Sequence, residues 1–131
     1  MNDDKIMNLW LAIALGGASG AMSRYWLMSY TISVLGKTFP YATLFVNVSG
    51  SFVLGFLSVV LWSKWSLPEE LKLAIIVGFL GSFTTFSTFS LDVLNSFLAG
   101  HYVRLFIYII ASVSLSIVAV GLGYLAAKVV V

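Results

Sequence analysis

The feature that most limits the fold of this chain is a series of four long apolar stretches separated by short polar segments. A helix needs about 20 mostly apolar residues to cross the hydrocarbon core of a bilayer. The 131 residues therefore leave room for four such helices and little else, and with 60% hydrophobic and 9% charged residues the chain has too little polar surface for a soluble domain. We predict an all-α membrane protein in which residues 1–131 form a single transmembrane domain, with transmembrane helices at residues 9–30, 41–62, 71–98 and 103–128.

The third apolar stretch contains a segment, GFLGSFTTFSTF at residues 78–89, whose chemistry a simple lipid anchor does not need. Hydroxyl side chains are closely spaced in it, at Ser82, Thr84, Thr85, Ser87 and Thr88. Gly81 and Ser82 in mid-span favour local unwinding, which leaves backbone groups that must face protein, water or an ion. We predict that the third helix is broken near Gly81, as helices at transport sites often are. The alternative is an unbroken helix whose small residues serve close packing.

The second and fourth spans each carry a row of uncharged polar side chains. Thr43 and Asn47 lie four residues apart and therefore share one helical face, and Tyr108, Ser112 and Ser116 recur every four residues. The carboxamide of Asn47 needs partners in hydrocarbon, which leaves two interpretations, a hydrogen bond between helices or a pore-lining group. A path lined by hydroxyl and amide groups suits a small ion, although this inventory does not determine the sign of its charge.

The first span combines small residues with one cation. Gly16 and Gly20 lie on one face, which predicts a close contact with another helix. Arg24 lies near the predicted end of this span, so its side chain either reaches the headgroups or lines an aqueous vestibule, where it would concentrate anions. In the third span, Phe86 and Phe89 stand three residues apart on one face.

The sequence offers no residues for catalysis, so we expect a protein that is not an enzyme. It contains no cysteine, one histidine, and no paired carboxylates, nucleophile with a base, metal-ligand cluster or phosphate loop. Two further classes remain as alternatives: an ion-coupled small-molecule exporter built as a four-helix dimer, and a structural subunit of a larger complex. The exporter is disfavoured because no carboxylate lies near mid-span and Asp92 is close to a helix end.

The basic residues are divided almost evenly between the two sides of the membrane. Lys5, Lys64, Lys72 and Lys128 fall on one side of the four spans, and Arg24, Lys37 and Arg104 on the other. Because the positive-inside rule depends on such an imbalance, we expect copies to insert in both orientations and to pair antiparallel.

These residues together resemble the Fluc (CrcB) family of fluoride channels. The resemblance covers nearly the whole chain: GGASGAMSRY in the first span, TLFVNVSGSFVLGF in the second, GFLGSFTTFSTFS in the third, and Tyr108, Ser112 and Ser116 in the fourth. It implies an antiparallel, dual-topology homodimer in the bacterial cytoplasmic membrane. Such a dimer, surrounded by lipid and without a nucleic-acid partner, would export fluoride passively and relieve fluoride toxicity.

The resemblance also implies roles for individual residues. Phe86 and Phe89 would present their ring edges to fluoride, Asn47 would be the pore asparagine, and the polar lining would consist of Thr43, Thr88, Tyr108, Ser112 and Ser116. The carbonyl groups of Gly81 and Thr84 from both subunits would hold one structural sodium ion at the dimer centre. Two of these roles have physical support, since an aromatic edge is the positive end of the ring quadrupole and free carbonyls suit a hard cation.

Overall fold

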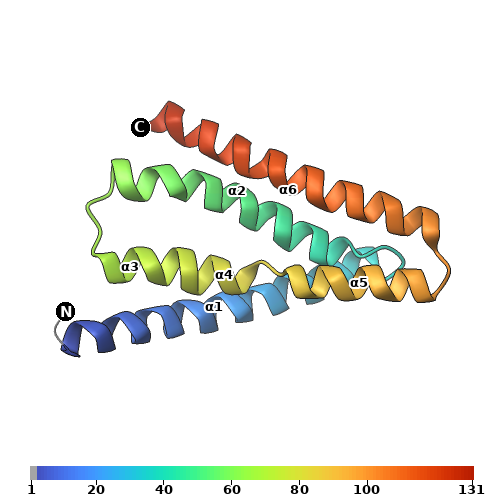
Figure 1. The fold of residues 1–131 in the computed structure, drawn as a ribbon, viewed down its shortest axis with the longest axis horizontal. Coiled ribbons are helices and arrows are strands. Elements are labelled where there is room, and N and C mark those ends of the chain that lie inside the picture. The colour runs from blue at the N-terminus through green and yellow to red at the C-terminus, as the bar shows by residue number, and fades with distance from the viewer. Residues whose placement is uncertain (1–2) are drawn as a thin grey trace.

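In the computed structural model, which describes residues 3–131, helices account for almost the whole chain (Figure 1). In chain order the elements are α1 (Asp3–Leu35), α2 (Tyr41–Ser63), α3 (Glu69–Leu73), the π-helical segment η1 (Ala74–Leu80), α4 (Gly81–Phe83), α5 (Phe86–Leu98) and α6 (Tyr102–Val130). Within the described residues, four helices are long and apolar enough to span a membrane: α1, α2, the interrupted helix over Glu69–Leu98, and α6. The predicted all-α architecture with four membrane-spanning helices is confirmed.

Helix α1 is longer than predicted, because polar residues near its end do not stop it. The predicted span ended at residue 30, whereas α1 continues to Leu35. The hydroxyl of Thr31 donates to the carbonyl of Leu27 at 2.8 Å, so it is satisfied inside the helix. Gly36, with a φ of 74°, then ends the helix. Arg24 was predicted to lie near the end of this helix. It lies instead about three turns before the end of α1.

The third membrane-spanning helix is broken as predicted, but the break lies at Thr84 and Thr85 and not at Gly81. Gly81 has helical backbone angles (φ −63°, ψ −31°), whereas Thr84 (φ −79°, ψ 157°) and Thr85 (φ −152°, ψ 112°) are extended. The hydroxyl of Thr85 accepts the N–H of Thr88 at 3.1 Å and thereby caps α5. A glycine permits unwinding without requiring it, so the position of this hydroxyl cap determines where the second half of the helix begins.

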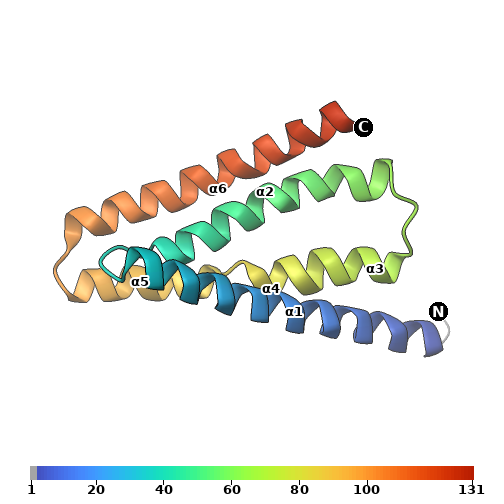
Figure 2. The same cartoon turned by 180° about the vertical axis from the view of Figure 1, so that it is seen from behind.

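The helices pack as two close pairs, α1 with η1 and α2 with α6 (Figures 1 and 2). Glycine makes both contacts possible. A Cβ atom on Gly20 of α1 would overlap the carbonyl oxygen of Phe79, and one on Gly55 of α2 would overlap that of Val120. Gly16 lies equally close to the η1 backbone, so the predicted close contact of Gly16 and Gly20 is confirmed. In a bilayer the hydrophobic effect does not drive helices together, because lipid tails are as apolar as the side chains. Close packing of this kind therefore stabilises the contact between helices.

The two ends of the bundle are distinct. The N-terminal end of α1, the C-terminus and the α2–α3 connection (residues 64–68) lie at one end, which we call the terminal end (Figure 1). The α1–α2 connection (residues 36–40) and the α5–α6 connection (residues 99–101) lie at the other, which we call the loop end. The helix break lies between the two ends.

We expect Gly20→Ala to destabilise the protein, because the added methyl group would overlap a backbone carbonyl that no rotamer change can move. Overpacking of this kind costs about 1–3 kcal/mol, measured as a fall in the thermal unfolding midpoint followed by tryptophan fluorescence in detergent. The matched control is Gly121→Ala in α6, since a Cβ there meets nothing within 4 Å. Equal midpoints for Gly20→Ala and the parent would mean that the α1–η1 contact does not limit stability.

Candidate functional site

The break in the third span is held by the side chain of Asn47, which projects from α2. Its Oδ1 accepts the backbone N–H of Thr85 at 2.7 Å, and its Nδ2 donates to the carbonyl oxygen of Thr85 at 3.0 Å. One carboxamide thus satisfies both backbone groups of an extended residue at membrane depth, where such groups need protein partners. Of the two interpretations of Asn47 that the sequence allowed, the hydrogen bond between helices is therefore present.

A cavity of about 310 Å³, which we call the central cavity, lies beside this break. Its lining comes from α2, the break, α5 and α6, and consists of Asn47, Ser51, Leu54, Thr84, Thr85, Phe86, Phe89, Ser112, Val113, Ser116 and Ile117. None of these side chains is charged. The structure therefore brings together five of the residues predicted for the pore, namely Asn47, Phe86, Phe89, Ser112 and Ser116.

Ser112 stands out among the residues of the central cavity. Its side chain is buried, and its Oγ is the one buried side-chain oxygen or nitrogen in the described residues that has no hydrogen-bond partner. A buried polar group without a partner costs about 1–3 kcal/mol. The cavity thus contains a hydroxyl that can donate to a guest.

Aromatic rings connect the central cavity with the loop end. The ring centroids of Phe86 and Phe89 are 5.3 Å apart, and those of Phe89 and Tyr108 are also 5.3 Å apart. Phe39, from the α1–α2 connection, meets Tyr108 at 5.7 Å with nearly perpendicular ring planes. Phe89 is buried, whereas Phe86 is 77% exposed in the single chain. One side of the central cavity therefore lacks a cover.

Tyr108 and Thr43 do not line the central cavity; they bond to Asp92 instead. The Oδ2 atom of Asp92 accepts the Thr43 hydroxyl at 2.6 Å and the Tyr108 hydroxyl at 3.0 Å. Tyr108 is fully buried. Phe89, whose ring contacts that of Tyr108, lines the central cavity, whereas Thr43 and Asp92 line a second one.

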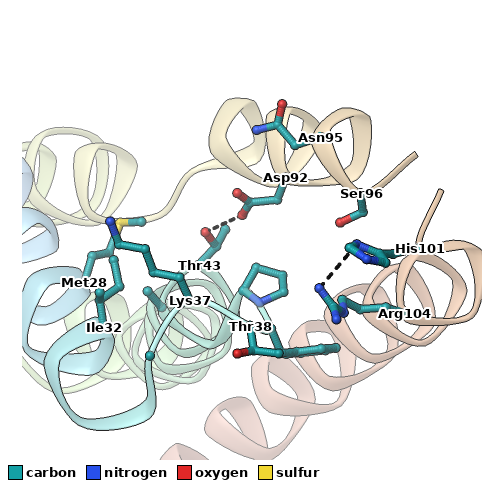
Figure 3. A pocket seen from close by; sticks show the side chains of 14 residues that line it. Met28, Ile32, Lys37, Thr38, Thr43, Asp92, Asn95, Ser96, His101 and Arg104 are labelled. Atoms are coloured by element: carbon teal, nitrogen blue, oxygen red, sulfur yellow. Dashed lines mark hydrogen bonds between the residues drawn. The ribbon is translucent and has the colours of Figure 1, made fainter. Parts of the chain in front are cut away.

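The second cavity, of about 400 Å³, lies at the loop end, and we call it the loop-end cavity (Figure 3). Its lining includes Thr43 and Asp92 together with the cationic side chains of Lys37 and Arg104 and the imidazole of His101. Arg24, predicted to line a vestibule, lines neither cavity, because α1 continues beyond it and carries Met28 and Ile32 to the loop end.

Thr88 also lines neither cavity. Its N–H and its hydroxyl both bond to the hydroxyl of Thr85, at 3.1 Å each, so it belongs to the cap of α5. The same bonds leave two carbonyl groups without their helical partners. The N–H of Thr85, which would bond to Gly81 in a continuous helix, bonds to Asn47, and that of Thr88, which would bond to Thr84, bonds to Thr85. The carbonyl oxygens of Gly81 and Thr84 are thus available to another partner.

Sequence reasoning missed Thr85 and underrated Asp92. Thr85 was one hydroxyl among several, although threonine is a favoured residue at the N-cap of a helix. Asp92 was set aside as lying near a helix end, although it follows Phe89 by one helical turn. Its partners come from two other helices, which local spacing does not reveal.

Fold and site together define a class: small multi-pass membrane proteins that surround an uncharged polar cavity beside a broken helix, as ion-transport proteins do. The family model described as "CrcB-like protein, Camphor Resistance (CrcB)" matches residues 11–124. The chain belongs to this family, as the sequence motifs predicted.

Three similar proteins each carry the name fluoride-specific ion channel FluC. That from Methylococcus capsulatus is 48% identical over 123 residues, which are 93% of this chain and 54% of the relative. That from Rhizobium leguminosarum bv. trifolii is 45% identical over 113 residues (86% of this chain, 90% of the relative), and that from Dehalococcoides mccartyi is 50% identical over 113 residues (86% and 87%). The chain therefore spans about half of the first relative and most of the other two.

Proposed function

We propose that this protein is a fluoride-specific channel, through which fluoride leaves the cell passively and its toxicity is relieved. The single observation that carries the proposal is the unpartnered hydroxyl of Ser112 inside an uncharged cavity lined by Phe86 and Phe89. The names of the similar proteins agree with it.

The chemistry of the central cavity fits a small, strongly hydrated anion. Such an ion crosses a narrow path only where donors replace its water without trapping it. Ser112 and Ser116 offer hydroxyl donors, and the two phenylalanines offer ring edges, the positive part of their quadrupoles. Because no cation lines this cavity, an ion bound there is free to leave.

An ion-coupled exporter fits the site less well. Such exporters exchange protons at a carboxylate within the substrate cavity, and none lines the central cavity. Asp92, the acid closest to it, accepts hydrogen bonds from Thr43 and Tyr108 and faces the loop-end cavity. A merely structural subunit would have no use for a buried hydroxyl without a partner.

The proposed assembly is an antiparallel homodimer with dual topology. A second copy would cover the open side of the central cavity, where Phe86 is 77% exposed. The basic residues are nearly equal in number on the two sides, with four lysines toward the terminal end and Arg24, Lys37 and Arg104 toward the loop end, which gives a single orientation little advantage.

We further propose one structural sodium ion at the two-fold axis of this dimer, held by the carbonyl oxygens of Gly81 and Thr84 from each subunit. The residues fit the ion, because both carbonyls have lost their helical partners. Within the described residues no cluster of histidine, cysteine and acidic side chains forms a transition-metal site. Oxygen ligands without nitrogen or sulfur suit a hard cation.

We expect Phe86→Ile and Phe89→Ile to lower fluoride flux by about tenfold or more, the effect of roughly 1.4 kcal/mol on the barrier. Isoleucine keeps much of the bulk and removes the ring quadrupole. Flux would be measured with a fluoride electrode as efflux from proteoliposomes at zero coupling gradient. Asn47→Asp should also reduce flux, because a carboxylate cannot donate to Thr85 and adds a repelling charge to the cavity.

Two variants serve as controls in the same assay. Phe79→Ile removes a ring that stacks on Phe83 outside the central cavity, and Asn8→Asp adds a charge at an exposed position that lines neither cavity. Both should keep flux within about twofold of the parent. Phenylalanine variants that stay folded and conduct equally well would assign the rings to packing, and absence of passive flux from the parent would refute the channel.

The proposed dual topology can be tested by cysteine labelling, because the sequence contains no cysteine that would react with the label. A single cysteine added at the C-terminus is labelled by a membrane-impermeant maleimide, first from outside intact cells and then after permeabilisation. About half of the copies should react from outside, because the charge imbalance is close to zero. Replacing Ser66 by lysine should shift that fraction. A single population in the parent protein would contradict dual topology.

Replacing sodium by N-methylglucamine in the purified dimer should lower the thermal unfolding midpoint, and adding sodium back should restore it, since a ligand bound only to the folded state stabilises it. Potassium at the same ionic strength is the control. A thermal unfolding midpoint that does not change with sodium would refute the proposed sodium site at the Gly81 and Thr84 carbonyls.

A further inference from the structure

The face of α2 that carries Asn47 also carries Gly50, about one helical turn later. Residues three apart lie on the same side of a helix, so both residues face the break in the third span. Asn47 bonds to the backbone of Thr85, at 2.7 Å through its Oδ1 and at 3.0 Å through its Nδ2. Gly50 is buried against the two residues before Thr85, which are Phe83 and Thr84. One face of α2 thus contacts both extended residues of the break.

The contact made by Gly50 differs in kind from the close contacts of other glycines in the bundle. Gly20 and Gly55 lie against backbone carbonyl groups of neighbouring helices, whereas a Cβ atom on Gly50 would overlap the Cγ2 methyl group of Thr84. The next nearest atom would be Cδ1 of the Phe83 ring, at 3.1 Å. The absence of a side chain at position 50 therefore leaves the space that the Thr84 methyl group occupies.

The hydroxyl of Thr84 keeps the methyl group in this space. The N–H and the hydroxyl of Thr84 both donate to the carbonyl oxygen of Leu80, at 3.1 Å and 3.0 Å. Because the hydroxyl and the methyl group of threonine share one Cβ atom, the bond that fixes the first also fixes the second. Thr84 is therefore held from two sides, by Leu80 at the end of η1 and by Gly50 of α2.

We propose that Gly50 is a positioning residue for the sodium site: by receiving the Thr84 methyl group, it places the Thr84 carbonyl oxygen where a sodium ion can bind. This inference rests on the proposed sodium ion. The Thr84 carbonyl has lost its helical partner, since the N–H of Thr88 bonds to the hydroxyl of Thr85. Its orientation then depends on how α2 holds residues 84 and 85, through Gly50 and Asn47.

A metal site is sensitive to such positioning, because its ligand atoms lie within about 0.2 Å of their ideal distances. A methyl group at position 50 fits only if Thr84 moves away from α2 or gives up its hydroxyl bond to Leu80. Either change moves the peptide group between Thr84 and Thr85, whose oxygen is the proposed ligand. The same face of α2 therefore positions the sodium site through Gly50 and the wall of the central cavity through Asn47.

The test moves one methyl group across this contact. It compares the parent with Gly50→Ala, with Thr84→Ser, and with the double variant Gly50→Ala/Thr84→Ser. Serine keeps a hydroxyl that can bond to Leu80 and lacks the methyl group, so the double variant returns the missing methyl group from the other side. The apparent Kd for sodium is obtained for each purified protein from the rise of the thermal unfolding midpoint with sodium concentration, with N-methylglucamine keeping the ionic strength constant.

We expect Gly50→Ala to raise the apparent Kd for sodium about tenfold or more, because the added methyl group displaces the Thr84 carbonyl. Thr84→Ser, which empties the space, should raise it about threefold. The double variant should recover a Kd within about threefold of the parent, since the two changes occur at atoms in contact and are therefore not additive.

Two further variants separate sodium affinity from stability. Gly55→Ala, on the same helix, overlaps the backbone of α6 and should lower the midpoint measured without sodium. Gly121→Ala meets nothing within 4 Å and should leave that midpoint unchanged. Both should keep the apparent Kd for sodium within about twofold of the parent, because neither lies at the break.

Three outcomes overturn the inference. A parental Kd in Gly50→Ala would show that this residue does not position the Thr84 carbonyl. A raised Kd that the double variant does not recover would assign the effect to Phe83 or to α2 as a whole. If Gly50→Ala does not fold, a parental Kd in Thr84→Ser decides against the contact. Absence of any sodium response in the parent would refute the sodium ion itself, and is distinguishable because the parent would then yield no Kd.

Discussion

The structure depends on one constraint of the bilayer, which is that hydrocarbon offers no hydrogen-bond partner to a free peptide group. A broken helix is stable there only if other parts of the protein supply the missing bonds. Asn47 supplies two of them to Thr85, and the hydroxyl of Thr85 supplies another to Thr88. The broken span thus requires an amide on a different helix, which fixes the register of α2 against the break and places the central cavity between them.

The two cavities differ in the charge of the side chains that line them. The central cavity contains hydroxyl, amide and aromatic groups, whereas all the charge near the pathway lies in the loop-end cavity. Asp92 lines the loop-end cavity and accepts hydrogen bonds from Thr43 and Tyr108. Of the two cavities, only the loop-end one is therefore lined by charged side chains.

Much of this organisation was readable from the sequence, because hydropathy determines the four spans and helical periodicity groups the polar residues. Ser112 and Ser116 line the same cavity because a spacing of four keeps their side chains on one face of α6. The position of the break was not readable from Gly81, since a glycine only permits unwinding while the cap at Thr85 determines it. Arg24 lies farther from the end of its helix than the sequence indicated, because Thr31 bonds within the helix and does not end it. The role of Asp92 depends on partners from other helices, and the π-helical turn of η1 has no comparable signal in the sequence.

Position 112 shows how folding and function can make opposite demands on one residue. A buried hydroxyl without a partner makes the folded state less stable than a smaller apolar side chain would, by about 1 kcal/mol or more. Alanine at this position would relieve that cost and remove the donor. A protein selected for stability alone would have no reason to keep serine here, and the proposed channel function supplies one, since the hydroxyl can donate to an ion in the central cavity.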